Sequence, residues 1–322
     1  MNQLIIILYL SAFLLALHKN FIKIIRAKQT IFIILISISF ISCNKNLLSP
    51  HTNYKNSSYL SGDYIDLSKV SLKDLTNKMN EYLNGNPYNM LCFKGNIDSN
   101  KLKIIKDYIK GSDRLIYLDL KNCTNWDNNS NNDYTFSGLS NLSGIKLTHD
   151  CYQSKVYMFK DCINITNIVF PDSMSNFQVN TFENTPKLKY LKIPDTVSVC
   201  GIMCFYDTYI ETLVFGNNMR ILGDNALQKC TNLKTLVINE VFERFAKSAL
   251  SQCSNLTEIV YYGTINRKIE FDRDVFYRCP TNELILYLPN IERHELDNFS
   301  WPKEYYKYAY CKGEFDINEI LR

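Results

Sequence analysis

A chain of 322 residues that is 46% hydrophobic and 21% charged has enough apolar material for a sizeable core, which excludes the class of disordered proteins. The formal net charge of +4 comes entirely from residues 1–42, which hold four of the 36 basic residues and no acidic one, so that 32 basic and 32 acidic residues remain. Residues 43–322 are therefore neutral overall and contain no run of Lys and Arg. They lack the positive field that nucleic-acid binding uses, so we expect no nucleic-acid partner.

Residues 1–42 have the pattern of an export signal. A basic stretch from Lys19 to Lys28 precedes the apolar run Ile31–Ile41, which is too short to span a bilayer. The tetrapeptide Phe40–Cys43 resembles the lipobox of bacterial lipoproteins, although Phe40 stands where leucine is usual. The resemblance implies lipidation of Cys43 as the first residue of the mature chain. The alternative is a membrane-anchoring or buried helix that ends in an ordinary cysteine.

A second apolar run, Leu4–Leu17, lies upstream, and a signal peptide does not need two. We favour a true translation start near Lys19 over a bipartite leader. Residues 43–64 are rich in Asn, Ser, Lys and Tyr, which predicts a lipidated flexible tether.

Residues 65–114 are predicted to form a small helical N-terminal cap. Ser71 precedes apolar residues at helical spacing, and a second helix is expected from Ser99 to Gly111, with a short strand at Asn89–Phe93 between them. Such a cap would cover the open apolar end of a repeat array.

An internal repeat dominates residues 115–289. The spacing L-x-x-L-x-L recurs six times, with starts that advance by 22 or 23 residues, and an earlier copy, Leu115-Leu118-Leu120, precedes an insert at Trp126–Tyr134. The six starts are Leu142, Ile165, Leu188, Ile210, Leu233 and Leu256. This period falls in the leucine-rich-repeat range and predicts about seven coils of 22–23 residues, followed by a C-terminal cap at 290–322.

The second half of each unit repeats as well, with a large apolar residue three positions before a small one. The large residues are Phe136, Phe159, Phe182, Phe205, Leu227, Leu250 and Phe276. We expect them to stack from coil to coil in the interior. Four of the small positions are Cys162, Cys230, Cys253 and Cys279, which predicts free, buried cysteines rather than disulfides.

The unit from Leu188 to Val197, followed by Cys204-Phe205, resembles the BspA-like, or Treponema pallidum type, leucine-rich repeat of bacterial surface proteins. The first copies are similar to those of spirochaete lipoproteins in that family. The resemblance covers 115–308 and implies an α/β repeat fold, a leucine-rich-repeat solenoid. A proline follows the strand at Pro171, Pro194 and Pro289; Gly216, Asn239 and Gly263 replace it elsewhere, which predicts looser turns in those copies.

Catalytic signatures are absent from the sequence. The four histidines are scattered, no nucleotide-binding or nucleophile motif occurs, and the acidic pair Asp272 and Asp274 falls in a turn where charge is simply solvated. Cys200 and Cys204 lack the second pair that a zinc site needs. We expect no enzyme, no metal and no cofactor; an enzyme of unrecognised type is the remaining alternative.

Strand alternation predicts a binding face, because the third and fifth residues of each L-x-x-L-x-L strand point outward. The candidate binding residues are Tyr117, Asp119, Lys146, Asn167, Tyr190, Lys192, Thr212, Thr235 and Glu258. Valines stand at the fifth position of the remaining L-x-x-L-x-L strands. This indicates either the preference of valine for strands or cover of these positions by a neighbouring segment.

We therefore expect a lipid-anchored protein of the cell envelope, on the outer membrane and exposed at the cell surface. Its solenoid would serve protein recognition or adhesion, with a host or neighbouring-cell protein as ligand. The lipid on Cys43 would attach the protein to the membrane. The alternative is a structural lipoprotein retained in the periplasm.

Overall fold

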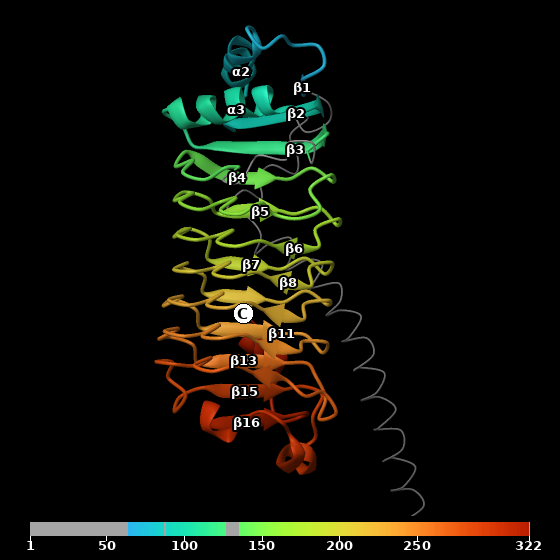
Figure 1. Cartoon of the computed structure of the whole chain (residues 1–322), viewed down its shortest axis with the longest axis vertical. Helices are drawn as coiled ribbons and strands as arrows, with labels where there is room; N and C mark the ends of the chain where they lie inside the picture. Colours follow the sequence, from blue (N-terminus) through green and yellow to red (C-terminus); the bar gives the residue numbers. More distant parts are fainter. Residues whose placement is uncertain (1–63, 87, 127–134, 322) are drawn as a thin grey trace, which may run out of the picture. The chain divides into compact units, whose positions relative to one another are not determined.

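The computed structural model describes residues 64–86, 88–126 and 135–321, all of which belong to one compact unit. Successive coils of this unit stack one upon another, each adding a strand parallel to the one before (Figure 1). The prediction of a leucine-rich-repeat solenoid is thereby confirmed. The predicted leader, the lipidation site Cys43 and the tether lie outside the described residues.

The N-terminal part contains two helices and two strands. They are β1 (Ile65–Asp66), α2 (Leu75–Asn84), β2 (Met90–Asn96) and α3 (Ser99–Gly111). Helix α3 has the predicted bounds because the Asp98 carboxylate accepts a hydrogen bond from the Lys101 N–H at 2.9 Å, which caps its first turn. Helix α2 begins later than Ser71 predicts. The Ser71 hydroxyl donates to the Asp74 carboxylate at 2.6 Å and closes a separate turn before the helix.

The long strands of the coils form two parallel sheets. The first has the order β1-β2-β3-β4-β5, and the second has six strands in the order β16-β15-β13-β11-β9-β7, so the ladder is interrupted between β5 and β7. The new strands are β3 (Ile116–Thr124), β4 (Leu142–Lys146), β5 (Asn167–Val169), β7 (Tyr190–Lys192), β9 (Thr212–Val214), β11 (Thr235–Ile238), β13 (Glu258–Tyr261), β15 (Ile285–Leu288) and β16 (Tyr308–Cys311).

The strand ladder is longer than the predicted array at both ends. Strand β2, within the predicted N-terminal cap, pairs with β3, and β16, within the predicted C-terminal cap, pairs with β15. The prediction for the earliest copy was wrong at its first core position, whereas Leu118 and Leu120 are buried as predicted. Leu115 is 45% exposed and Ile116 is buried, because the register shifts between Ile116 and Tyr117.

A third sheet on another side of the coils was not predicted. Its strands are two residues each, in the order β14-β12-β10-β8-β6. They are β6 (Asn176–Phe177), β8 (Val199–Cys200), β10 (Ile221–Leu222), β12 (Arg244–Phe245) and β14 (Glu270–Phe271). Two residues are too few to show a period-2 pattern, so the sequence carries no signal for them.

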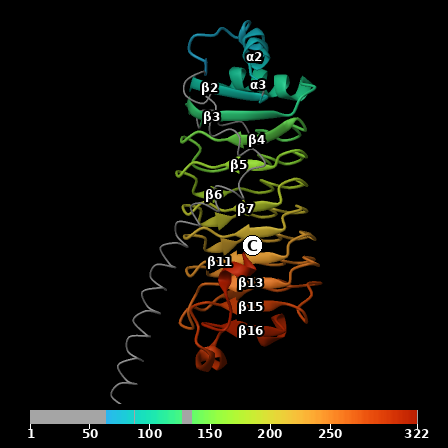
Figure 2. The same ribbon diagram turned by 180° about the vertical axis from the view of Figure 1, so that it is seen from behind.

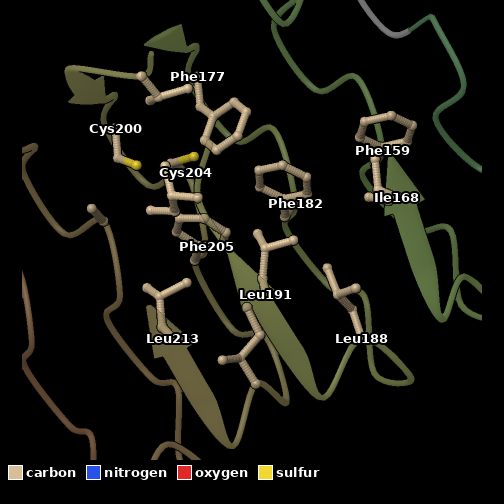
Figure 3. Packing of buried hydrophobic residues seen from close by; sticks show 14 of the residues in the cluster. Phe159, Ile168, Phe177, Phe182, Leu188, Leu191, Cys200, Cys204, Phe205 and Leu213 are labelled. Atoms are coloured by element: carbon tan, nitrogen blue, oxygen red, sulfur yellow. The ribbon is translucent and has the colours of Figure 1, made fainter. Parts of the chain in front are cut away.

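The predicted aromatic ladder fills the interior. The rings of Phe136, Phe159 and Phe182 stack with centroids 5.7 and 5.8 Å apart, and Phe205 continues the stack (Figure 3). Trp126 stacks on Phe136 at 5.8 Å and closes the ladder beneath the N-terminal strands. These rings are fully or almost fully buried, so they contribute to stability through burial as well as through stacking.

The ladder residues lie in tight turns rather than in helices. In six consecutive coils, the residues two positions before and two after the ladder residue have positive φ, as Asn180 and Asn184 do around Phe182 at 54° each. This geometry aims the Phe182 N–H at the Cys204 carbonyl of the next coil, 2.8 Å away. Backbone hydrogen bonds therefore link the coils on this side too, and among the described residues the repeats contain no α-helix.

At Gly216 and Asn239, two of the three positions that lack proline, the turns are closely packed, contrary to the prediction. Gly216 is buried, and a Cβ at this position would lie 2.3 Å from the Pro194 carbonyl oxygen. Asn239 is 7% exposed and its amide donates to the carbonyls of Gly216 and Met219. Close backbone approach and a side-chain amide take the place of the proline ring.

The C-terminal region closes the array with short 3-10 helices η3 (Arg293–Asn298) and η4 (Lys303–Tyr305) and the one-turn helix α4 (Ile317–Ile320). Trp301, only 2% exposed, lies with its ring centroid 5.0 Å from that of Phe271 and 6.0 Å from that of Phe245. It covers the apolar end of the last coils. Within the described part of the chain, no helix has the length and apolar character needed to cross a bilayer.

Candidate binding surface

The predicted binding residues lie on the outer surface of the two long-strand sheets. Tyr190 is in register with Thr212, and the same column continues through Thr235 to Glu258. In the first sheet, Tyr117 is in register with Gly144, and Asp119 with Lys146. The residues between them along each strand point inward and are buried, as the alternation requires.

The accessibility of this face changes along the array. Tyr117, Asp119, Lys146, Asn167, Tyr190, Thr212 and Glu258 are half-buried, and Lys192 is exposed. Thr235 lies on the face but is only 6% exposed, and its hydroxyl donates to the Glu258 carboxylate at 2.7 Å. Of the predicted contact residues, Thr235 is therefore not available to a ligand in this state.

Gly144 shapes the open part of the face, a role that sequence reasoning missed. A Cβ on Gly144 would lie 2.8 Å from two atoms of the Tyr117 ring and 3.0 Å from the Asn167 carbonyl oxygen. The Tyr117 ring therefore occupies the space that a side chain at Gly144 would need. A glycine inside a strand pattern, directly opposite a tyrosine, was the signal that could have revealed it.

Toward the N-terminal end, the face is closed beside helix α2. Met90 and Cys92 of β2 occupy the outward columns next to Tyr117 and Asp119, yet they are only 9% and 7% exposed. Burial raises the pKa of the Cys92 thiol to about 11, and Tyr82 of α2 lies within hydrogen-bond reach of it. The accessible part of the face therefore ends beside helix α2.

The other end is closed as well. Val214 is half-buried, whereas Val237 and Val260, the next two residues of the same outward column, are 5% and 0% exposed. Of the two interpretations of the valine column, cover by a neighbouring segment is the one that fits this burial. The open part of the face extends from β3 to β9.

Charges on the open part are few and of both signs. The Lys192 ammonium lies 3.7 Å from the Asp195 carboxylate, and the Lys189 ammonium lies 3.7 Å from that of Glu211. Exposed pairs of this kind contribute about 0 to 1 kcal/mol each. With tyrosines and single charges rather than one strong field, the face suits a mixed polar and aromatic protein contact.

The repeated cysteines are free, as predicted, and all but the half-buried Cys279 are buried. The thiols of Cys162, Cys230, Cys253 and Cys279 donate to the carbonyls of Phe136, Phe205, Leu227 and Leu250 at 2.9 to 3.1 Å. Burial raises the pKa of the Cys162 and Cys230 thiols to about 12, so neither is a reactive thiolate at neutral pH. Cys200 and Cys204 are likewise buried and free (Figure 3).

The other candidate groups for chemistry lie apart from one another. Asp272 accepts a hydrogen bond from the Arg244 guanidinium at 2.6 Å, whereas Asp274 is exposed in a turn. His149 contacts Asp150 on the surface at 2.9 Å, and His294 lies in η3. In the segments that the structure describes, no group of three or more His, Cys, Asp or Glu side chains could hold a metal ion.

Comparison with known proteins places the chain in a family. The model described as "BspA type Leucine rich repeat region" matches residues 92–189 and 155–283 with six copies, and no curated protein matches the chain. A leucine-rich repeat protein from Bacteroides ovatus is 19% identical (TM-score 0.39), over 55% of this chain and 42% of its own length. The T. pallidum leucine-rich repeat protein TpLRR is 16% identical (TM-score 0.40), over 56% of this chain and 78% of its own. Because the family model covers more than half of its residues, the chain belongs to the BspA-type leucine-rich-repeat family.

Proposed function

We propose that this protein is a lipid-anchored recognition protein of the bacterial cell envelope, which binds a protein ligand on the outer face of β3 to β9. The observation that carries the proposal is the face itself. Tyr117 and Tyr190 present half-buried rings there, with Asp119, Lys146 and Lys192 beside them. Tyrosines on a rigid sheet give a large contact area at a low cost in conformational entropy.

Family membership supports recognition rather than catalysis. Leucine-rich-repeat solenoids create extended surfaces from many coils, and such surfaces suit protein ligands. We therefore infer that the protein acts through binding.

The ligand proposal is tested with the full chain. A panel of host plasma and extracellular-matrix proteins is screened by surface plasmon resonance, and the partner found is measured against a Tyr190→Ala/Lys192→Ala variant. We expect the variant to lose at least about tenfold in affinity, because interface tyrosines often contribute 2 kcal/mol or more. A Tyr277→Ala/Lys247→Ala variant, whose residues are exposed away from this face, should retain wild-type affinity. Equal affinity of all three proteins would refute the assigned surface.

The anchor and location are tested in cells. Labelling with a radioactive fatty acid should mark the native chain and fail to mark Cys43→Ala, and protease treatment of intact cells should remove the body. Label that persists in Cys43→Ala would disprove the anchor. Protection from the protease would instead support the alternative, a structural envelope lipoprotein retained in the periplasm.

A further inference from the structure

The outer face of the six-stranded sheet carries a second apolar layer. Val237 and Val260 are almost completely buried, although they point away from the interior, which Leu236 and Ile259 fill from the same strands. Neither valine belongs to the apolar cluster that forms the core. Something other than the core therefore covers them.

A later segment of the chain lies on the same face. After β16 it turns back, and the Phe315 ring lies 5.1 Å from that of Tyr287, with the planes at 60°. Tyr287 is in register with Val260, so Phe315 reaches the same outward column. Tyr310 of β16 stacks on the other side of Tyr287 at 5.6 Å.

Helix α4 follows directly after Phe315. In both views of the molecule the C-terminal end of the chain lies at the level of β11 and β13 (Figures 1 and 2). The segment of residues 315–321, which we call the return segment, is amphipathic. It combines Phe315, Ile317, Ile320 and Leu321 with the acidic Asp316 and Glu319.

The return segment is held weakly. None of its residues is buried, whereas Val260 on the same face is 0% exposed. The hydrogen bonds that the structure gives residues 315–321 all lie within the segment, such as that from the Asn318 N–H to the Asp316 carboxylate at 2.9 Å. A four-residue helix is unstable in isolation, so the segment depends on contacts such as that of Phe315 with Tyr287.

We propose that the outer face of β11, β13 and β15 is a binding site for a short acidic, amphipathic protein segment, and that residues 315–321 are its resident occupant. The inference deepens the proposed function and rests on it: a protein ligand with this chemistry displaces the return segment and gains the β11–β15 surface in addition to the open part of the face. The resident occupant lowers the apparent affinity for a foreign segment, because a ligand binds only the fraction of molecules in which the site is free.

The test uses a fluorescein-labelled synthetic peptide of residues 312–322 as the probe and the full chain as the receptor. In a Phe315→Ala/Ile320→Ser variant the return segment loses two of its apolar side chains, and fluorescence anisotropy should then give at least a tenfold lower dissociation constant for the peptide than in wild type. The matched control is Ile202→Ser/Tyr209→Ala, which changes an exposed aliphatic and an exposed aromatic residue elsewhere. It should bind the peptide as wild type does.

A second variant locates the site. Val237→Thr/Val260→Thr, introduced into the Phe315→Ala/Ile320→Ser chain, keeps the side-chain shape but makes the patch polar, and should lower peptide affinity at least tenfold. Its circular dichroism and unfolding midpoint establish that it is folded. Equal peptide affinity of wild type and the Phe315→Ala/Ile320→Ser variant, or of that variant with and without the two threonines, would overturn the proposal. Loss of the proposed function would instead appear as insensitivity of ligand binding to Tyr190 and Lys192, which leaves the peptide result unaffected.

Discussion

The ring of Phe182 stacks on the ring of Phe205, with centroids 4.8 Å apart and ring planes 7° apart. The two residues are 23 positions apart in sequence and occupy the same place in consecutive coils. Each ring is buried because the next coil supplies its neighbour, so neither coil has a complete interior alone.

Replacing one ring of this ladder should destabilise the array as a whole. We expect Phe182→Ala to lower the free energy of unfolding by about 3 to 5 kcal/mol, through lost burial and the cavity left between the coils. Urea denaturation followed by circular dichroism measures the loss. Tyr277→Ala, at a position 51% exposed, is the control and should change stability by less than about 0.5 kcal/mol. Similar losses for the two variants would contradict the stacking argument.

Gly144 should be required for the position of Tyr117. We expect Gly144→Ala to destabilise by about 1 to 3 kcal/mol, because the new methyl group overlaps the ring. Much of this loss should vanish in a Tyr117→Ala background, since the ring is then absent and only the contact with the Asn167 carbonyl remains. A double-mutant cycle measures the coupling. Additive losses would mean that Tyr117 does not lie over Gly144 in solution.

The Asn239 side chain should stabilise the turn in which it lies. Its amide group satisfies two buried carbonyls and its side-chain oxygen accepts from the Val241 N–H at 3.1 Å. Asn239→Ala leaves these groups without partners and should cost about 1 to 3 kcal/mol. Asn218→Ala, at an exposed position, is the matched control. Thermal unfolding compares them, and an unchanged midpoint for Asn239→Ala would refute the role.

Stability should fall at alkaline pH because of the buried thiols. Burial raises the pKa of Cys162 from its ordinary value of 9.0 to about 12, so the folded state favours the protonated thiol. The stabilisation is complete below pH 9 and is lost as the pH rises toward 12, because the unfolded chain releases the proton first. Urea midpoints measured from pH 8 to 11 should therefore decline.

Cys162→Ser gives the corresponding control. Its hydroxyl can still donate to the Phe136 carbonyl but does not titrate, so the decline with pH should be smaller than in wild type. A smaller decline is expected rather than none, since burial also raises the pKa of Cys230 and of Tyr261 to about 12. If the urea midpoint declined equally with pH in wild type and Cys162→Ser, a raised pKa of Cys162 would be contradicted.

The repeat period and the ladders could be predicted because each is a local pattern copied many times. The spacing of Phe159, Phe182 and Phe205 alone indicates stacked coils, and the capping residue Asp98 fixes the start of α3. Where one copy departs from the pattern, the sequence misleads. Leu115 looks like the first core position, and only the register shift at β3 shows that Ile116 takes its place.

The limits of the binding face could not be predicted, because they depend on segments distant in sequence. Val214 and Val260 have the same position in their repeats, yet one is half-buried and the other fully buried. Phe315, more than 50 positions after Val260, lies beside Tyr287 in the same outward column, and no periodicity links the two segments. The same holds for helix α2, which closes the other end.

The hydrogen bonding of each coil to its two neighbours has an evolutionary consequence. Loss or duplication of one whole 23-residue unit would bring together two coils whose bonding groups already match, and would change the length of the array by one strand spacing of about 4.8 Å. A deletion that removes part of a strand or of a ladder turn would instead break hydrogen bonds to both neighbouring coils. The gene can therefore vary the reach of its product in fixed steps while helix α2 and Trp301 continue to close the two ends.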